Sequence, residues 1–173
     1  MMPQPIRSAK GHPLKLHTLI REQLLDRPPA DVFPFFADAH NLEAITPPLL
    51  GFEIVGPGPP TMAVGTLIQY RLRMRGLSVD WLTRIEEWQP GVSFVDTQLV
   101  GPYRLWHHTH TFEERSGGTL MRDVVRYALP LWPVGELAGP LVRRDLTMIF
   151  DFRRQAVARA LERDAEQPDA GAS

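Results

Sequence analysis

The chain has 173 residues, of which 43% are apolar and 23% are charged, and its formal net charge is −1. These values predict one folded domain with a sizeable core and argue against a protein that binds nucleic acid through a basic face. The absence of cysteine excludes disulfides, thiolate nucleophiles and cysteine-ligated metal sites. No segment approaches the roughly 20 apolar residues of a transmembrane segment, and no apolar run suits a signal peptide, so we expect a cytoplasmic protein.

The composition of the chain changes at both ends. Residues 1–15 are rich in proline, glycine and charge, and we expect them to form a flexible N-terminus. Residues 164–173 are small and polar, which predicts a disordered tail. Between them, residues 16–163 contain neither a linker nor an internal repeat. We therefore expect one continuous domain over this range.

The first predicted elements are one strand and two short helices. Leu16–Leu25 alternates apolar and polar residues, as a half-buried strand does. Two prolines end this strand, and Ala30–Asp38 follows with apolar residues at helical spacing; Pro29 suits the first turn of this helix. Asn41–Ile45 is predicted as a second, shorter helix, with Asn41 as its N-cap.

Six strands are predicted next, with turn-forming glycine and proline residues between them. Thr66–Arg75 has the clearest alternation, with Ile68 and other apolar residues on one face and Arg71, Arg73 and Arg75 on the other. This pattern is typical of an antiparallel strand with one buried face and one wet face. The predicted strands are Phe52–Val55, Thr66–Arg75, Val79–Trp88, Val92–Val100, Tyr103–Glu114 and Thr119–Leu129.

A long amphipathic helix is predicted over Val134–Arg163, with Pro140 marking a kink or a late start. Its predicted apolar stripe consists of Leu137, Leu141, Ile149, Phe152, Ala156 and Ala160. The concave face of the sheet is the one large apolar surface that can bury this stripe. The sequence therefore predicts an α+β fold in which a curved antiparallel sheet of about seven strands wraps around a long C-terminal helix. The predicted order is β-α-α-β6-α, with an internal cavity between sheet and helix.

Two histidines distinguish the predicted strand Tyr103–Glu114. Side chains alternate along a strand, so His108 and His110 share a face with Trp106 and Phe112, which we expect to be buried. Burying an imidazole without a partner costs free energy. We therefore expect polar partners for both histidines on the neighbouring strands.

Two turns flank this strand, and their positions predict the partners. The turn centres are Ser116-Gly117 on one side and Gly101-Pro102 on the other. Counting outward from them predicts four pairs: His110 with Asp123, Trp106 with Tyr127, His108 with Asp96, and Trp106 with Gln98. A register slip of one residue or a β-bulge would change any of these pairings.

Three interpretations of this polar cluster remain open. His-x-His beside an aspartate can supply metal ligands. His–Asp pairs also orient imidazoles for general acid/base catalysis, with His108, His110 and Asp123 as the candidates. The interpretation that we adopt is a hydrogen-bonded network that lines a cavity and orients a ligand, without a metal or a cofactor.

The predicted ligand-binding residues are those that the pattern places on the concave face of the sheet or on the buried stripe of the helix. They are Tyr70, Trp81, Phe94, Asp96, Gln98, Trp106, His108, His110, Asp123, Tyr127, Ile149 and Phe152. Because the apolar residues predominate and the polar ones gather in one place, we expect an apolar ligand with a polar end.

Four segments carry a resemblance to a known family. They are RPPADVFPFFADAHNLEAITPP, WLTRIEEWQPGVSFVDTQLVGPYRLWHHTHTFEE, GGTLMRDVVRYALP and RRDLTMIFDFRRQAVARAL. Together with the order of elements, they resemble the START-like (SRPBCC) helix-grip superfamily and, within it, a bacterial polyketide cyclase/dehydrase-like branch. The likeness runs from Leu16 to Leu161.

This resemblance implies a START-like ligand-binding domain over residues 16–163, with the ligand in a cavity under the helix. Proteins of this superfamily bind lipids, sterols, polyketides, plant hormones or quinones, and some are enzymes. The expected partner is therefore an apolar small molecule such as a lipid, quinone, sterol or polyketide, held by a carrier or a sensor. The alternative is a cyclase- or dehydratase-type enzyme that acts on a polyketide-like substrate with His108 or His110 as acid/base. Nothing in the sequence sets an oligomeric state.

Overall fold

We describe a computed structural model of the chain, in which residues 15–59, 61–131 and 133–166 are defined. Most of the predicted flexible N-terminus and of the predicted tail lies outside these residues. The final helix continues to Glu166, beyond residue 163 where the sequence analysis ends the domain.

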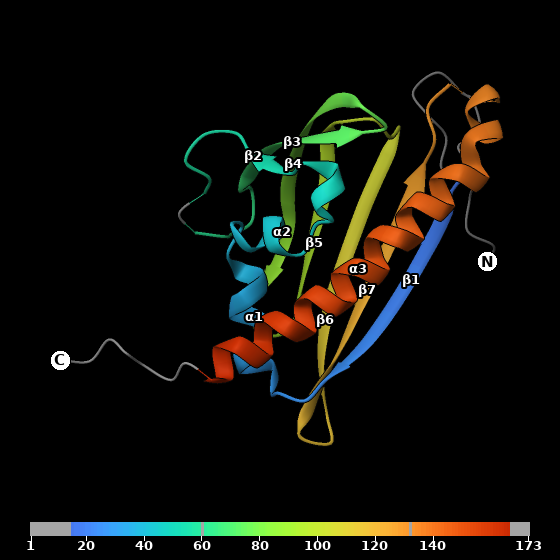
Figure 1. Cartoon of the computed structure of the whole chain (residues 1–173). Coiled ribbons are helices and arrows are strands. Elements are labelled where there is room, and N and C mark those ends of the chain that lie inside the picture. The colour runs from blue at the N-terminus through green and yellow to red at the C-terminus, as the bar shows by residue number, and fades with distance from the viewer. Residues whose placement is uncertain (1–14, 60, 132, 167–173) are drawn as a thin grey trace.

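The elements follow the predicted order of one strand, short helices, six strands and a long helix (Figure 1). The strands are β1 (His17–Leu25), β2 (Glu53–Ile54), β3 (Leu67–Met74), β4 (Leu77–Gln89), β5 (Ser93–Val100), β6 (Leu105–Arg115) and β7 (Gly118–Ala128). The helices are α1 (Pro29–Ala37), α2 (Asn41–Ala44) and α3 (Gly139–Glu166), with 3₁₀ turns η1 (Pro48–Leu50) and η2 (Val134–Ala138).

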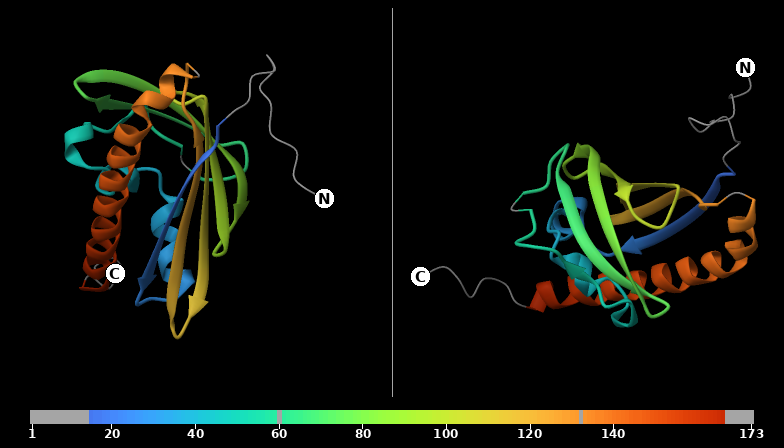
Figure 2. Two further views of the ribbon diagram at one scale, coloured as in Figure 1. Left: turned by 90° about the vertical axis from the view of Figure 1, so that its right-hand side faces the viewer. Right: turned by 90° about the horizontal axis from the view of Figure 1, so that it is seen from above.

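All seven strands form one antiparallel sheet in the order β1-β7-β6-β5-β4-β3-β2. The sheet is curved, and α3 lies across its concave side (Figure 2). Strand β4 contains two register shifts against β5, at Leu82/Thr83 and at Ile85/Glu87. Such bulges bend a strand and increase its twist, which helps the sheet to close around the helix. The predicted helix-grip architecture is confirmed.

The β6–β7 hairpin has a two-residue turn that fixes its register. Ser116 and Gly117 both have positive φ, 51° and 82°, as a type I′ turn requires. Arg115 pairs with Gly118 at the turn, and the ladder continues without interruption to Leu105 and Ala128. The turn therefore determines which residues meet along the whole hairpin.

The buried face of α3 agrees with the predicted stripe at Ala156 and Ala160, which are 6% and 7% exposed, and differs from it toward the start of the helix. Its most buried large residues are Leu146, Phe150, Val157 and Leu161, whereas Leu137 is 84% exposed. Leu137 lies in η2, and a 3₁₀ turn has about 3.0 residues per turn instead of 3.6, so a stripe drawn at α-helical spacing through this residue loses its phase. The buried set instead follows spacings of four, seven and four from residue 146 onward.

An aromatic cluster joins α1 to the sheet at one end of the molecule. Phe33 is 6% exposed, and its ring lies 5.1 Å from that of Trp88 and 5.3 Å from that of Phe112. Val157 of α3 belongs to the same cluster and is 1% exposed. This cluster therefore joins α1, the sheet and α3.

Replacing Phe33 should measure how much this cluster contributes. We expect Phe33→Ala to lower the free energy of unfolding by about 3–5 kcal/mol, because it removes buried area and leaves a cavity. Leu24→Ala is the control, since Leu24 is 67% exposed and its loss should cost about 0.5 kcal/mol or less. Urea denaturation of the two variants checks this, and equal losses would contradict the assignment of the core.

Candidate functional site

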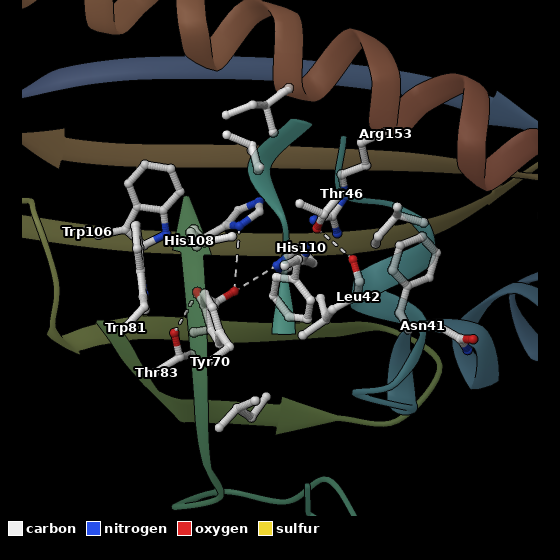
Figure 3. A pocket seen from close by; sticks show the side chains of 18 of the residues that line it. Asn41, Leu42, Thr46, Tyr70, Trp81, Thr83, Trp106, His108, His110 and Arg153 are labelled. Carbon is white, nitrogen blue, oxygen red and sulfur yellow. Dashed lines mark hydrogen bonds and ion pairs between the residues drawn. The ribbon is translucent and has the colours of Figure 1, made fainter. Parts of the chain in front are cut away.

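A cavity of about 170 Å³ lies between the concave face of the sheet and α3, with α1 and α2 at one end (Figure 3). Its walls are mostly aromatic and aliphatic side chains. The predicted ligand-binding residues that line it are Tyr70, Trp81, Phe94, Asp96, Trp106, His108, His110 and Ile149. The sequence pattern therefore identified much of the sheet side of this cavity.

Four predicted ligand-binding residues do not line the cavity. The β5–β6 ladder ends at Thr97 and His107, so the predicted pair of Trp106 with Gln98 does not form. The Gln98 amide instead donates to the carbonyl of Tyr103 at 2.6 Å and accepts from its N–H at 3.3 Å, which closes the turn.

The other three residues lie close to the cavity but point elsewhere. The Tyr127 ring stacks on the ring of His17, its partner across the β1–β7 ladder, with ring centres 5.1 Å apart. Phe152 packs on the aromatic cluster of α1, because the cavity faces a different side of α3. Asp123 lies behind the two histidines and contacts them from outside the cavity.

Of the lining residues on the helices, sequence reasoning identified Ile149 and missed several others. Leu146, Phe150 and Arg153 line the cavity from α3, and Phe36 lines it from α1. The signal that identifies the α3 residues is their spacing of four and three, which continues to Val157. Thr83 of β4 was also missed, although it lies two residues after the predicted Trp81 and therefore on the same face of the strand.

The polar end of the cavity is a group of four side chains from three adjacent strands, which we call the His–Asp quartet: Asp96, His108, His110 and Asp123. As predicted, His108 lies opposite Asp96 in the β5–β6 ladder, and His110 lies opposite Asp123 in the β6–β7 ladder. Both histidines and Asp123 are buried, at 4%, 2% and 7% exposure. The imidazole rings are 3.7 Å apart at their centres.

Each imidazole of the quartet lies between both carboxylates. His110 Nε2 is 2.9 Å from Asp96 Oδ2, and His110 Nδ1 is 2.8 Å from Asp123 Oδ1. His108 Nε2 is 3.0 Å from Asp123 Oδ1, whereas His108 Nδ1 is 3.6 Å from Asp96 Oδ2. Figure 3 shows the contacts of the two histidines converging on one carboxylate oxygen. The His110 Nδ1–H does not point at Asp123, so that contact is an ion pair without a directed hydrogen bond.

The hydrogen bonds place a proton on Nε2 of each imidazole of the quartet. His108 Nε2 donates to Asp123 and His110 Nε2 donates to Asp96. The other two contacts are not hydrogen bonds, since His110 Nδ1 has no hydrogen-bond partner among the described residues and His108 Nδ1 is 3.6 Å from Asp96 Oδ2. His110 lies 2.9 Å and 2.8 Å from the two carboxylates, whereas His108 lies 3.0 Å and 3.6 Å from them, so the carboxylates favour the charged form of His110 more than that of His108.

The environment moves the pKa values of the two histidines in opposite directions. Burial, together with the charge on His110, lowers the pKa of His108 to about 4. Burial also opposes the charge on His110, but its contacts with Asp123 and Asp96 outweigh burial and raise its pKa above the ordinary value of 6.5. The two adjacent imidazoles therefore take up protons in different pH ranges, His110 at a higher pH than His108.

Both carboxylates of the quartet stay ionised. Burial alone would raise their pKa values. The hydrogen bond from His110 and the positive charges around it lower the pKa of Asp96, and the charge of Arg153 with the contacts of both histidines holds the pKa of Asp123 well below 3.8. The Arg153 guanidinium lies above the rings of Phe36 and Phe150, 5.7 Å and 5.9 Å from their centres. It thus supplies a positive charge beside the quartet.

Asp96, His108 and His110 also meet a distance condition for a metal site, since one ligand atom from each lies within 4.8 Å of the others. Two nitrogens and one carboxylate oxygen are a donor set that zinc and iron accept. In this structure the same atoms are engaged with each other, with His110 Nε2 donating to Asp96 Oδ2. A metal ion would have to displace that hydrogen bond.

One family matches the sequence over most of its length. The sequence profile of the family described as "Polyketide cyclase / dehydrase and lipid transport" matches residues 17–166. Among proteins of curated function, no relative matches the sequence. In the described residues, none of the helices combines the length and apolarity that crossing a bilayer requires.

Several solved structures share the fold. The Zhui aromatase/cyclase from Streptomyces sp. R1128 aligns with a TM-score of 0.71 at 14% identity, covering 92% of this chain and 100% of that chain. A protein from Thermus thermophilus aligns with a TM-score of 0.66 at 19% identity, covering 86% and 99%. A protein from Chromobacterium violaceum aligns with a TM-score of 0.65 at 18% identity, covering 88% and 98%. At these identities the likeness concerns the fold alone.

The opposite pKa shifts of the two histidines predict how stability depends on pH. Between pH 6.5 and about 4 the unfolded chain binds a proton at residue 108 that the folded chain does not, so stability falls as the pH falls. The raised pKa of His110 acts in reverse, since its contribution is present below pH 6.5 and is lost as the pH rises through the folded pKa. We expect His108→Gln to remove on the order of 3 kcal/mol of the decline on the acidic side. Urea denaturation from pH 4 to pH 8 checks this.

The control for this prediction is His40→Gln, because the side chain of His40 is 62% exposed. This variant removes only the exposed contact of His40 with Asp38, which lowers the pKa of Asp38, so its curve of stability against pH should differ from that of the wild type by less than about 1 kcal/mol. A curve for His108→Gln that is parallel to that of the wild type would show that His108 titrates normally, which would contradict its lowered pKa.

The quartet also predicts the response to divalent metal. Because a metal ion on Asp96, His108 and His110 would have to displace the hydrogen bond from His110 Nε2 to Asp96 Oδ2, we expect stoichiometric Zn²⁺ to leave the melting temperature unchanged. A bound metal at 100 times its dissociation constant would instead stabilise the fold by about 2.7 kcal/mol. Thermal denaturation with and without Zn²⁺ measures this, and a saturable stabilisation that Asp96→Asn abolishes would contradict the expectation.

Proposed function

The chain belongs to the polyketide cyclase/dehydrase and lipid-transport family, and from that premise we propose that it is a carrier or sensor that binds an apolar small molecule with a polar end. The observation that carries this proposal is the cavity, whose walls are mostly apolar and carry a few polar groups, among them Asp96, His108 and His110. Ligand pockets in proteins commonly combine an apolar lining with a few polar groups that fix the orientation of the ligand.

Two parts of the cavity wall differ enough to orient a ligand. Trp81, Tyr103 and Trp106 form an aromatic wall, with ring centres 4.9–5.7 Å apart. The His–Asp quartet lies on the same side of the sheet and supplies the charged groups. An apolar body against the aromatic wall, with an oxygen or nitrogen atom toward the quartet, matches both surfaces.

The volume of the cavity limits the size of the ligand. Pockets around drug-sized ligands measure about 300–1,000 Å³, and a cavity of about 150 Å³ holds benzene. At about 170 Å³, this cavity fits a single ring with a small substituent. A sterol, a long acyl chain or an extended polyketide enters only if the cavity widens, for example by movement of α3 away from β3.

A second candidate function is acid/base catalysis by a cyclase- or dehydratase-type enzyme. The observation that favours it is the separation of the two histidine pKa values, since catalytic sites often place a neutral and a charged group side by side. In this role His108 would accept a proton and His110 would donate one, with Asp123 as the positioning residue behind both.

Filling the cavity should abolish binding of a small apolar probe. Ile149 lines the cavity from α3, so we expect Ile149→Trp to weaken the binding of toluene at least tenfold. Met148 is the adjacent residue, is 40% exposed and is not a lining residue, so Met148→Trp should bind as the wild type does. Ligand-detected NMR measures both, and binding by Ile149→Trp with wild-type affinity would place the binding site elsewhere.

The natural ligand distinguishes the carrier from the enzyme. Native mass spectrometry of protein purified from its own host should reveal a copurified small molecule. We expect this ligand to be recovered chemically unchanged after prolonged incubation with excess protein. Conversion of the ligand by the wild type, and not by His108→Asn, would instead establish the enzyme.

A further inference from the structure

Arg153 brings a charged group to the part of the cavity wall that α3 forms. The other lining residues of this helix are apolar, namely Leu146, Ile149 and Phe150. The Arg153 side chain extends from α3 toward the sheet (Figure 3). Its Nε is buried and has no hydrogen-bond partner among the described residues. A guanidinium has five N–H donors and stays charged at ordinary pH, so this residue has donors to offer.

Two aromatic rings hold the guanidinium of Arg153. It lies over Phe36 of α1 and Phe150 of α3, 5.7 Å and 5.9 Å from the ring centres. Both rings line the cavity and are buried, at 7% and 5% exposure. Attraction to an aromatic ring acts on the positive charge and leaves the capacity to donate to oxygen unfilled. The rings therefore position Arg153 while its N–H groups remain available.

The carboxylates of the quartet do not take up these donors. The charge of Arg153 lowers the pKa values of Asp96 and Asp123, so these groups lie near one another. In the parts of the chain that the structure describes, however, both carboxylates form their ion pairs with His108 and His110, and neither forms one with Arg153. Arg153 can therefore donate to a ligand without breaking a contact within the quartet.

Trp81 contributes a second buried donor to the wall, since its Nε1 also lacks a hydrogen-bond partner among the described residues. This indole is neutral, and its N–H lies within an aromatic cluster, where the π-face of a ring can accept it weakly. The neighbouring rings, with centres 5.5–5.8 Å away, are those of Tyr70, Tyr103 and Trp106. Hydrogen bonds from a charged donor are roughly twice as strong as those from a neutral one. An acceptor oxygen therefore gains more at Arg153 than at Trp81.

The shape of a guanidinium matches an oxygen acceptor. Its N–H groups lie in one plane and point outward in parallel pairs, so a carbonyl oxygen or a carboxylate can accept two of them. A buried N–H group without an acceptor is unfavourable, because it has lost water and gained no partner. A ligand that brings such an oxygen removes this cost, whereas a hydrocarbon leaves it in place.

We infer that Arg153 is a ligand-binding residue of the cavity and donates hydrogen bonds to an acceptor oxygen, of a carbonyl or a carboxylate group, at the polar end of the ligand. This inference rests on the proposed function, because it requires the ligand to occupy this cavity. It is independent of the protonation of the two histidines, since the donor is the guanidinium.

Three single-ring probes of similar shape test the inference. Isopropylbenzene, acetophenone and benzoate each carry a branched substituent on a phenyl ring, and the last two carry acceptor oxygens. At pH 7 acetophenone is neutral and benzoate is ionised. The measured quantity is the ratio of the affinity for an oxygenated probe to that for isopropylbenzene. Comparing this ratio between wild type and variant cancels the free energy of taking each probe out of water.

Arg153→Met keeps an unbranched apolar side chain and removes the donors. We expect this variant to lower the ratio for acetophenone roughly ten- to hundredfold, because a hydrogen bond from a charged donor is lost. Its affinity for isopropylbenzene should stay close to that of the wild type. Arg154→Met is the matched control, since Arg154 is the adjacent residue, is exposed and does not line the cavity, and it should keep the wild-type ratios. Titration calorimetry, or ligand-detected NMR for weak binders, gives the affinities.

Benzoate separates the two kinds of acceptor. A larger fall of its ratio than of the acetophenone ratio in Arg153→Met would identify a carboxylate as the preferred group. An equal or smaller fall would identify a neutral carbonyl. Both results support donation by Arg153.

A spectroscopic measurement tests the inference without a change at residue 153. Donation to the carbonyl of bound acetophenone moves its ¹³C resonance downfield of its position in an apolar solvent. We expect this shift in the wild type and also in Trp81→Phe, which removes the indole N–H. An unshifted resonance in the wild type overturns the inference. A shift that disappears in Trp81→Phe would assign the hydrogen bond to the indole, and that result overturns it as well.

The outcomes separate this inference from the proposed function. If none of the three probes binds, the cavity is not a binding site and both proposals fail. If isopropylbenzene binds and the ratios for both oxygenated probes are the same in Arg153→Met as in the wild type, the proposed function stands and the inference about Arg153 is overturned. An equal fall of the ratios in Arg154→Met also overturns it, because the effect would then come from surface charge.

Discussion

The sharing of charge among Asp96, His108, His110 and Asp123 is the interaction on which the rest of this structure depends. A buried ion pair that loses one partner destabilises a protein by about 3–5 kcal/mol, because an uncompensated charge stays in the interior. The quartet has four such groups on three strands, with nitrogen–oxygen distances of 2.8–3.6 Å. A slip of one residue in either hairpin would turn a histidine or an aspartate to the other face of the sheet. The network and the register therefore enforce each other.

Curvature of the sheet gives this network a cavity to line. The bulges of β4 bend the sheet toward α3, and the helix covers the concave face without filling it. In the resulting cavity, Asp96, His108 and His110 are held by their contacts within the quartet, whereas Arg153 Nε has no hydrogen-bond partner among the described residues. Groups that are already held in place need little rearrangement to receive a ligand. Arg153 contributes its charge from the helix, so the cavity depends on both layers of the fold.

The sequence was most informative where local chemistry determines the geometry. Ser116-Gly117 forms a two-residue turn, so counting from it predicted that His110 faces Asp123 and that Trp106 faces Tyr127. The sequence-based prediction failed where contacts between distant segments determine the geometry. Gln98 was predicted to face Trp106, but its amide bonds the backbone of the turn instead. Leu137 was predicted on the buried stripe but lies in η2, which precedes the helix, and Phe152 was predicted to line the cavity where Phe150 and Arg153 do. Nothing in a single sequence gives the rotation of a helix on a sheet.

The quartet is also local in the chain, although it lies in the centre of the domain. Its hydrogen bonds join residues 14 and 15 positions apart, whereas β1 and β7 pair His17 with Tyr127. Closing a short loop costs less entropy than closing a long one, and contacts between near neighbours in sequence form faster. The meander of β5, β6 and β7 is therefore expected to assemble early in folding, with β1 and α3 docking on it later. Folding would then complete the charged wall first, while it is still in contact with water, and the docking of α3 would remove that water as the cavity closes.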